Sequence, residues 1–128
     1  MAKEIDQRIN ELPFSDLGNS EALAALYGDK LRYVHGEGRH IWKESYWQPD
    51  AVQETRMFVD QLARERQRIA VSYNNDKTER QERVKQAFGL ENRYKSWACL
   101  DHAQHMEPFS TPPSALDRDL MLLACSNG

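Results

Sequence analysis

Apolar side chains recur along this chain with two different periods, which separates helical from extended segments. Between residues 14 and 30, three of them share one helical face: Leu23, Leu26 and Tyr27. Both ends of this helix have suitable residues. Asn19 or Ser20 can serve as its N-cap, and Gly28 suits the left-handed position that follows a last helical turn.

The next residues form short aromatic and β-branched runs that are typical of strands. LRYV and HIWK are separated by HGEGR, and a turn at Glu44-Ser45 leads to Tyr46-Trp47. Pro49 ends the last run because proline cannot donate a ladder hydrogen bond. We therefore predict a three-stranded antiparallel meander. Four aromatic residues are candidates for cross-strand packing: Tyr33, Trp42, Tyr46 and Trp47.

Helical spacing returns after the meander. Asp50, with Gln53 three residues later, predicts the start of the longest helix, whose apolar stripe is Val52, Val59, Leu62, Ile69 and Tyr73. After a break at residues 74–76, Thr78 with Gln81 predicts the start of a second helix, which Gly89 kinks or interrupts. Its apolar residues are Val84, Ala87, Phe88, Tyr94, Trp97 and Ala98. Two amphipathic helices joined by so short a turn are expected to pack antiparallel.

The remaining residues are loop-like. EPFSTPPSALDRD follows Met106, and LMLLACSNG then ends on Asn-Gly, a dipeptide that normally forms a turn between strands. We interpret this end as an interrupted element and expect the natural chain to continue. The predicted fold class is α+β, mainly helical with a small three-stranded antiparallel meander near the N-terminus, and residues 1–128 are treated as a single domain.

Composition narrows the class of protein. The chain has 128 residues, of which 40% are hydrophobic and 29% charged, enough for one modest core. The first ten residues lack the apolar run of a secretory signal, and no segment approaches the length of a membrane span. Two cysteines provide no disulfide framework. We expect a cytoplasmic protein without membrane association.

Two features suggest chemistry but favour structural interpretations. Gly36 and Gly38 precede a strand-like run rather than a helix, so they fit a hairpin loop better than a phosphate-binding loop. No G-x-x-x-x-G-K-S/T motif occurs, so we expect no ATP hydrolysis by this chain. Cys99 and His102 are spaced to share a helical face, but His105 points elsewhere and no fourth zinc ligand is apparent. We predict no catalytic residue, no metal site and no cofactor.

Charge is distributed unevenly. Residues 51–95 carry 10 basic and 7 acidic side chains, whereas both flanking segments have a net charge of -3. A basic segment between acidic ends can indicate an anionic partner. The candidate nucleic-acid contacts are Arg64, Arg68, Lys77 and Arg80. Interleaved carboxylates such as Glu65 and Glu79 also fit an ordinary solvated face with pairs along each helix, and this alternative is the stronger one.

Several phrases occur together in an order that resembles a known family. They are Ser15-Asp16, Gly18-Asn19, Gly28-Asp29, Leu31 to Val34, Trp42, Trp47 and Asp50, and, at the end, Leu116-Asp117 and Asn127-Gly128. This order resembles the domain that precedes the superfamily 3 helicase ATPase in phage and plasmid primase–helicases, also found in poxvirus-type replicative helicases. The resemblance spans roughly residues 14–128.

The resemblance implies an accessory or assembly domain of a DNA replication helicase. Such a domain positions an ATPase ring, can contact DNA weakly through the full-length protein, and can belong to a homo-oligomer. It implies an ATPase domain downstream, absent from this sequence, and a bacterial host of a phage or mobile element. Met1 lies close to the first matching residues, so we expect no primase module upstream. The resemblance carries over no catalytic residue.

Two other functions remain open at this stage. The chain could be a stand-alone phage interaction or regulatory protein that ends naturally at Gly128. It could also be a small metal-dependent enzyme that uses Cys99 and His102. Any DNA binding is expected to be weak and strongly salt-dependent.

Overall fold

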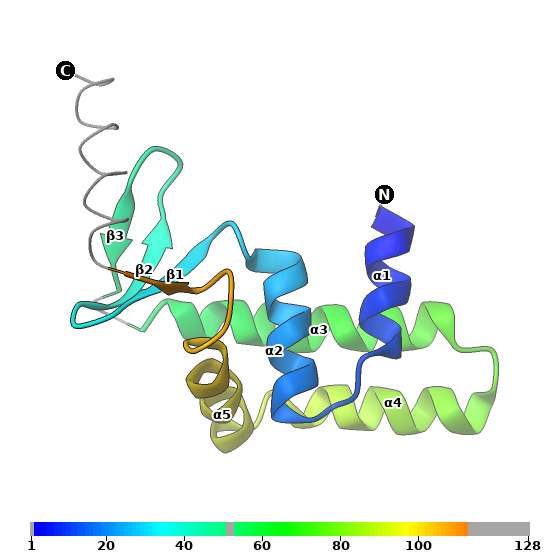
Figure 1. The fold of residues 1–128 in the computed structure, drawn as a ribbon. Helices are drawn as coiled ribbons and strands as arrows, with labels where there is room; N and C mark the ends of the chain where they lie inside the picture. The colour runs from blue at the N-terminus through cyan, green and yellow to red at the C-terminus, as the bar shows by residue number, and fades with distance from the viewer. Residues whose placement is uncertain (1, 51–52, 113–128) are drawn as a thin grey trace.

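A computed structural model describes residues 2–50 and 53–112. The described residues form five helices and four strands (Figure 1). In chain order the elements are α1 (Ala2–Glu11), α2 (Asp16–Tyr27), β1 (Leu31–Val34), β2 (Gly38–Trp42), β3 (Trp47–Pro49), α3 (Thr55–Tyr73), α4 (Lys77–Gly89), α5 (Arg93–Ala103) and β4 (Ser110–Thr111). The mainly helical α+β prediction is confirmed. None of these helices is both long and apolar enough to cross a membrane.

The sheet is mixed rather than a simple meander. Strands β1, β2 and β3 pair antiparallel as predicted, in the order β3-β2-β1, but β4 adds to the free edge of β1 in parallel orientation. The Tyr33 amide donates to the Phe109 carbonyl at 2.7 Å. Phe109 itself is buried and anchors the returning chain. A two-residue strand is too short to show an alternating pattern, so the sequence predicted only a loop there.

The turn chemistry of the meander agrees with the sequence. Gly36 and Gly38 have φ angles of 84° and 88°, the left-handed conformation predicted for the hairpin loop. Trp42 and Trp47 pack edge to face across the strands, with ring centroids 5.1 Å apart. The other two candidates do not pack across the strands in this way. Tyr46 is exposed, and the ring of Tyr33 contacts that of His35, two residues later in the chain.

Two predicted helix starts were too late by two to five residues. Ser15, rather than Asn19 or Ser20, caps α2, and its Oγ accepts from the Gly18 amide at 3.1 Å. Asp76, rather than Thr78, caps α4 through the Glu79 amide. In each case the true cap is an earlier Ser or Asp whose side chain reaches a free amide of the first turn.

The start of α3 follows a different arrangement. The Asp50 carboxylate accepts from the amides of Glu54 and Thr55 at 2.6 and 2.8 Å, but the helix begins only at Thr55. Asp50 therefore holds the first turn from outside the helix, and Val52 lies outside the described residues. The predicted interruption at Gly89 is confirmed, since α4 ends there and α5 begins at Arg93. Gly28 has a right-handed φ of -62°, so its predicted left-handed conformation was wrong.

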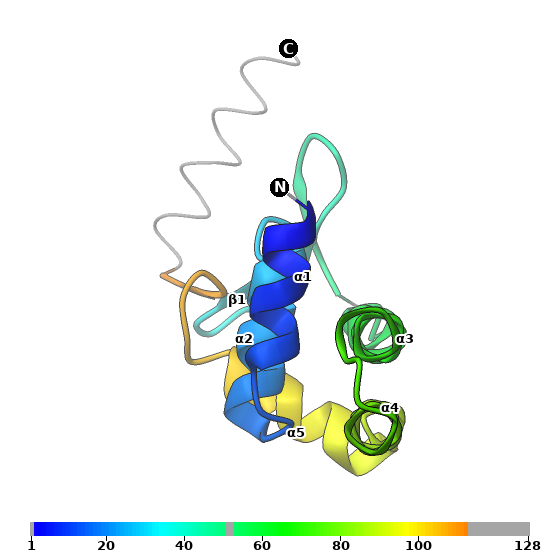
Figure 2. The ribbon, with the colours of Figure 1, turned by 90° about the vertical axis from the view of Figure 1, so that its right-hand side faces the viewer.

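The first helix was not predicted. Ile5, Ile9 and Leu12 are spaced by four and three residues, a short apolar stripe that could have indicated it. Ile9 is fully buried in a core built mainly from α2, α3 and α5, with contributions from Leu31 and Ile41 of the sheet. Figure 2 looks along α3 and α4 and shows α1 and α2 on one side of this antiparallel helical hairpin.

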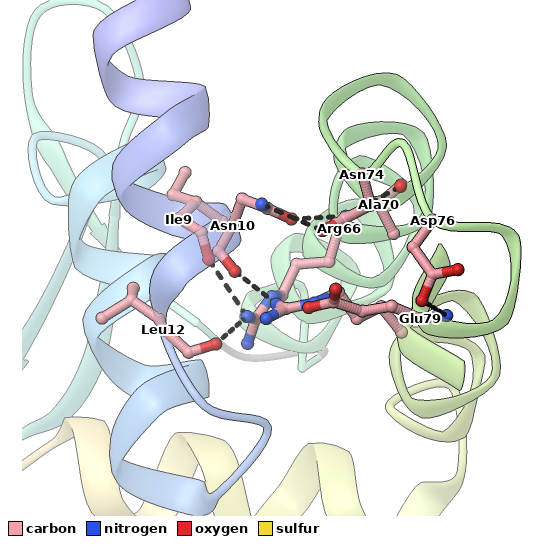
Figure 3. Close-up of polar contacts among 9 residues, drawn as sticks. Ile9, Asn10, Leu12, Arg66, Ala70, Asn74, Asp76 and Glu79 are labelled. Atoms are coloured by element: carbon pink, nitrogen blue, oxygen red, sulfur yellow. Dashed lines mark hydrogen bonds and ion pairs between the residues drawn. The ribbon is translucent and has the colours of Figure 1, made fainter. Parts of the chain in front are cut away.

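A buried arginine joins α1 and the following linker to α3. Arg66 is 2% exposed. Its Nη2 donates to the carbonyls of Ile9 and Leu12 at 3.1 and 2.6 Å. Its Nη1 donates to the Pro13 carbonyl at 3.1 Å and to Asn19 Oδ1 at 2.7 Å. Figure 3 shows the Ile9 and Leu12 carbonyls turned toward this guanidinium. Arg66 thus caps the C-terminal end of α1, where a helix dipole favours a cation.

Further polar contacts extend this junction. Asn74 Nδ2 donates to Asn10 Oδ1 at 2.9 Å and to the Ala70 carbonyl at 2.9 Å (Figure 3). The Nη1 of Arg83, on α4, donates to the Asn10 carbonyl at 2.5 Å. Both helices of the hairpin therefore supply an arginine to the end of α1.

We expect Arg66→Met to lower the free energy of unfolding by about 3 kcal/mol or more, because the oxygen acceptors around the guanidinium, above all the buried Asn19 Oδ1, would lose its donors. Arg64→Met, the same change at an exposed position of the same helix, should alter it by about 0.5 kcal/mol or less. Urea unfolding followed by circular dichroism measures both. Equal stabilities of the two variants would contradict this role of Arg66.

Candidate functional site: the outer face of the helical hairpin

The helical hairpin leaves one of its faces uncovered. Elements α1 and α2 pack on one side of α3 and α4, and the views in Figures 1 and 2 place no other described element on the opposite side of the pair. On that side a groove of about 410 Å³ lies between the two helices. Its lining residues are Gln67, Val71, Arg80, Gln81, Val84, Lys85 and Phe88.

The floor of this hairpin groove is apolar. Val71 from α3 and Phe88 from α4 are 58% and 62% exposed, and Val84 is half-buried beside them. The sequence places Phe88, and Tyr94 after it, among the apolar residues of a second helix that Gly89 kinks or interrupts. The break at Gly89 changes the direction of the chain, and both side chains are exposed instead.

The basic residues of segment 51–95 differ in burial and in their partners. Arg66 is buried, and burial, followed by the nearby charge of Arg83, lowers its pKa to about 10. Arg83 pairs with Glu79 at 3.2 Å in addition to its bond to α1. These guanidiniums serve internal contacts, so the net charge of residues 51–95 overstates the free positive charge on the hairpin.

The four predicted nucleic-acid contacts separate into different environments. Arg68 bridges Glu65 at 2.7 Å and Asp6 at 3.2 Å, and these hydrogen bonds, that of Glu65 first, raise its pKa. Arg80 lines the hairpin groove and makes a long bond of 3.5 Å to the Asn74 carbonyl. Arg64 and Lys77 are exposed and form no ion pair within residues 2–50 and 53–112. Lys85, which was not among the four candidates, also lines the groove.

The opposite side of α4 has the reverse charge. A cleft of about 680 Å³ lies between α4 and the segment around Pro13. Its carboxylates come from Glu11, Asp76, Glu79 and Glu82, with Arg83 as its basic residue. Helix α4 therefore separates an acidic cleft from a groove whose charged lining residues are both cations. A polyanion is attracted to one side of this helix and repelled from the other.

A second group of cations serves to join elements. Arg39 of β2 and Arg56 of α3 lie over the ring of Trp97, at 5.2 and 5.7 Å from its centroid. Arg39 also pairs with Asp101 at 3.2 Å. This cluster connects the sheet with α3 and α5 through cation–π contacts.

The environment of Cys99 does not fit a reactive thiol. Cys99 is fully buried, whereas His102 is exposed on the same helix. Burial raises the pKa of the thiol to about 11, which disfavours the thiolate that a nucleophile or a metal ligand needs. Within the described part of the chain, no group of three or more His, Cys, Asp or Glu side chains is placed to hold a metal ion.

The chain is similar to a family of known proteins. A family model described as D5 N terminal like matches residues 20–128. No curated protein and no solved structure matches the chain. The family match begins within α2 and extends past β4, so it does not include α1. It confirms the resemblance that the sequence phrases predicted.

We expect the Cys99 thiol to be protected in the folded protein. In a Cys125→Ser variant, which leaves one thiol, labelling by a disulfide reagent at pH 8 should be at least about a hundredfold slower than in urea, because the thiolate fraction is small and the sulfur is buried. The release of the chromophore measures the rate. Rapid labelling of the native variant would contradict a structural role for Cys99.

Proposed function

Because this chain belongs to the D5 N-terminal-like family of phage and viral primase–helicases, we propose that it is a non-catalytic accessory domain of a phage-type replication helicase. In this role it positions the ATPase ring that a downstream domain would form, within the cytoplasm of a bacterial host. The observation that carries the proposal is the family match over residues 20–128.

The architecture supports an assembly role. The core is built mainly from α2, α3 and α5 with the sheet, while α4 buries a single residue, Ala87, among its side chains. A helix that contributes so little to the core, and carries charged residues along most of its length, is suited to contact other molecules. Homo-oligomerisation of the full-length protein through such a surface is part of the proposal.

The reading frame after Gly128 tests this role directly. We expect an open frame that continues into a G-x-x-x-x-G-K-S/T motif on a strand–loop–helix, the signature of an ATPase. A stop codon directly after Gly128 would favour the alternative, a stand-alone phage interaction or regulatory protein. Sequencing the gene beyond this codon distinguishes the two roles.

Weak DNA binding is a second candidate function, favoured by the exposed cations Arg64 and Lys77 and by the groove-lining Arg80. Arg68 is a poorer candidate than the sequence indicated because Asp6 and Glu65 already compensate its charge. The acidic cleft on the other side of α4 further limits the affinity for a polyanion.

If these three cations contact single-stranded DNA, the logarithm of affinity should fall with the logarithm of salt with a slope of about -2. The double variant Arg64→Gln/Lys77→Gln should reduce the slope by roughly 1.4 units. Fluorescence anisotropy with a labelled oligonucleotide measures it. Arg93→Gln, which removes an exposed cation of α5, is the matched control and should leave the slope unchanged. Tight binding that is independent of salt would exclude this contact.

A further inference from the structure

The hairpin groove brings together exposed apolar side chains from both of its helices. Large apolar side chains more than half exposed are ordinary when scattered, but Val71 and Phe88 come from different helices and line the same hollow. Val84 completes a continuous apolar floor. Such a hollow is typical of a surface that another apolar group covers.

The shape of the groove suits a helix. It follows α4 over two turns, from Arg80 to Phe88, and is closed on the other side by one turn of α3, Gln67 to Val71. A third helix laid in the furrow between two antiparallel helices can place its own apolar stripe against such a floor. Apolar side chains at positions i, i+4 and i+7 of the incoming helix would meet Val71, Val84 and Phe88.

The charges of the groove indicate that its partner is negatively charged. Both charged residues of its lining, Arg80 and Lys85, are cations. Arg64 lies one turn before Gln67 and Arg68 on α3 and is exposed. We propose that this groove docks an acidic amphipathic helix of a partner protein, with apolar side chains on the floor and carboxylates at Arg80 and Lys85. This proposal rests on the accessory role proposed above, for which it names the chemical class of partner.

Nucleic acid fits the same groove less well. A phosphate backbone requires closely spaced cations, whereas much of the lining here is apolar or neutral. A carboxylate also lies at its border, where Glu91 accepts from Gln67 Nε2 at 3.1 Å. A helix with a few acidic residues can avoid this carboxylate, but a strand that is charged at every nucleotide is repelled by it.

The experiment uses the 128-residue chain and a synthetic probe. The probe is a labelled, acetylated and amidated peptide of about 16 residues, with leucine on one helical face and glutamate on the other. The control peptide has the same composition in scrambled order. Fluorescence anisotropy should show saturable binding of the amphipathic peptide, at least about tenfold tighter than that of the scrambled one.

Substitutions locate the binding. Phe88→Glu should weaken the binding of the peptide by about tenfold or more, because it places a like charge on the apolar floor. Lys85→Glu should weaken binding and reduce its salt dependence. Tyr94→Glu makes the same type of change at an aromatic residue of α5 that is 83% exposed and outside the groove, and should alter affinity by about twofold or less. Val71→Glu replaces Phe88→Glu if circular dichroism shows that the latter unfolds.

Three results would overturn the proposal. These are absence of peptide binding, equal binding of the scrambled peptide, and equal effects of Phe88→Glu and Tyr94→Glu. A single-stranded oligonucleotide that displaces the peptide and is sensitive to Lys85→Glu but not to Phe88→Glu would also overturn it, and would assign the face to nucleic acid. A stop codon after Gly128 would refute the helicase role without changing the peptide result. An open frame with no peptide binding would refute the docking alone.

Discussion

The arrangement of the helices depends on one buried cation without a carboxylate partner. Arg66 lies in the middle of α3, and its charge is compensated by the carbonyls of Ile9, Leu12 and Pro13 and by the Asn19 side chain. The ring of Phe14 covers its guanidinium at 3.8 Å. Burying an ion is unfavourable unless its donors are satisfied, and here the negative end of a helix dipole provides part of the compensation. The position of α1 is therefore determined by hydrogen-bond geometry as well as by apolar packing.

This junction also explains why the hairpin has two unlike faces. Arg66 from α3 and Arg83 from α4 both donate to the end of α1, so α1 and the linker after it occupy the same side of the pair. Asp6 continues the junction by accepting from Arg68 and from the Tyr73 hydroxyl. With these groups turned toward α1, the residues about half a turn away on each helix, such as Val71 and Lys85, remain on the outer face.

Elements with long or strongly marked sequence patterns could be predicted from the sequence. The meander with Gly36 and Gly38, the two helices of the hairpin and the break at Gly89 all follow from local chemistry. Elements that depend on contacts between residues distant in the sequence could not be predicted in this way. Strand β4 exists because Phe109 returns to the free edge of β1, which no period of two residues could indicate. Arg66 had a signal that was missed, since it lies four residues after Leu62 and three before Ile69 and so interrupts an apolar stripe with a charge.

The candidate site was only partly predictable for a related reason. A count of charges along the sequence treats every arginine as available, but the fold assigns Arg66 to the core, Arg68 to Asp6 and Glu65, and Arg83 to α1. The net charge of a segment is thus an upper limit on the positive charge that a partner meets. What remains in the hairpin groove is a small number of cations around exposed apolar side chains. Such a surface discriminates by shape as well as by charge, which favours a folded partner over a flexible polyanion.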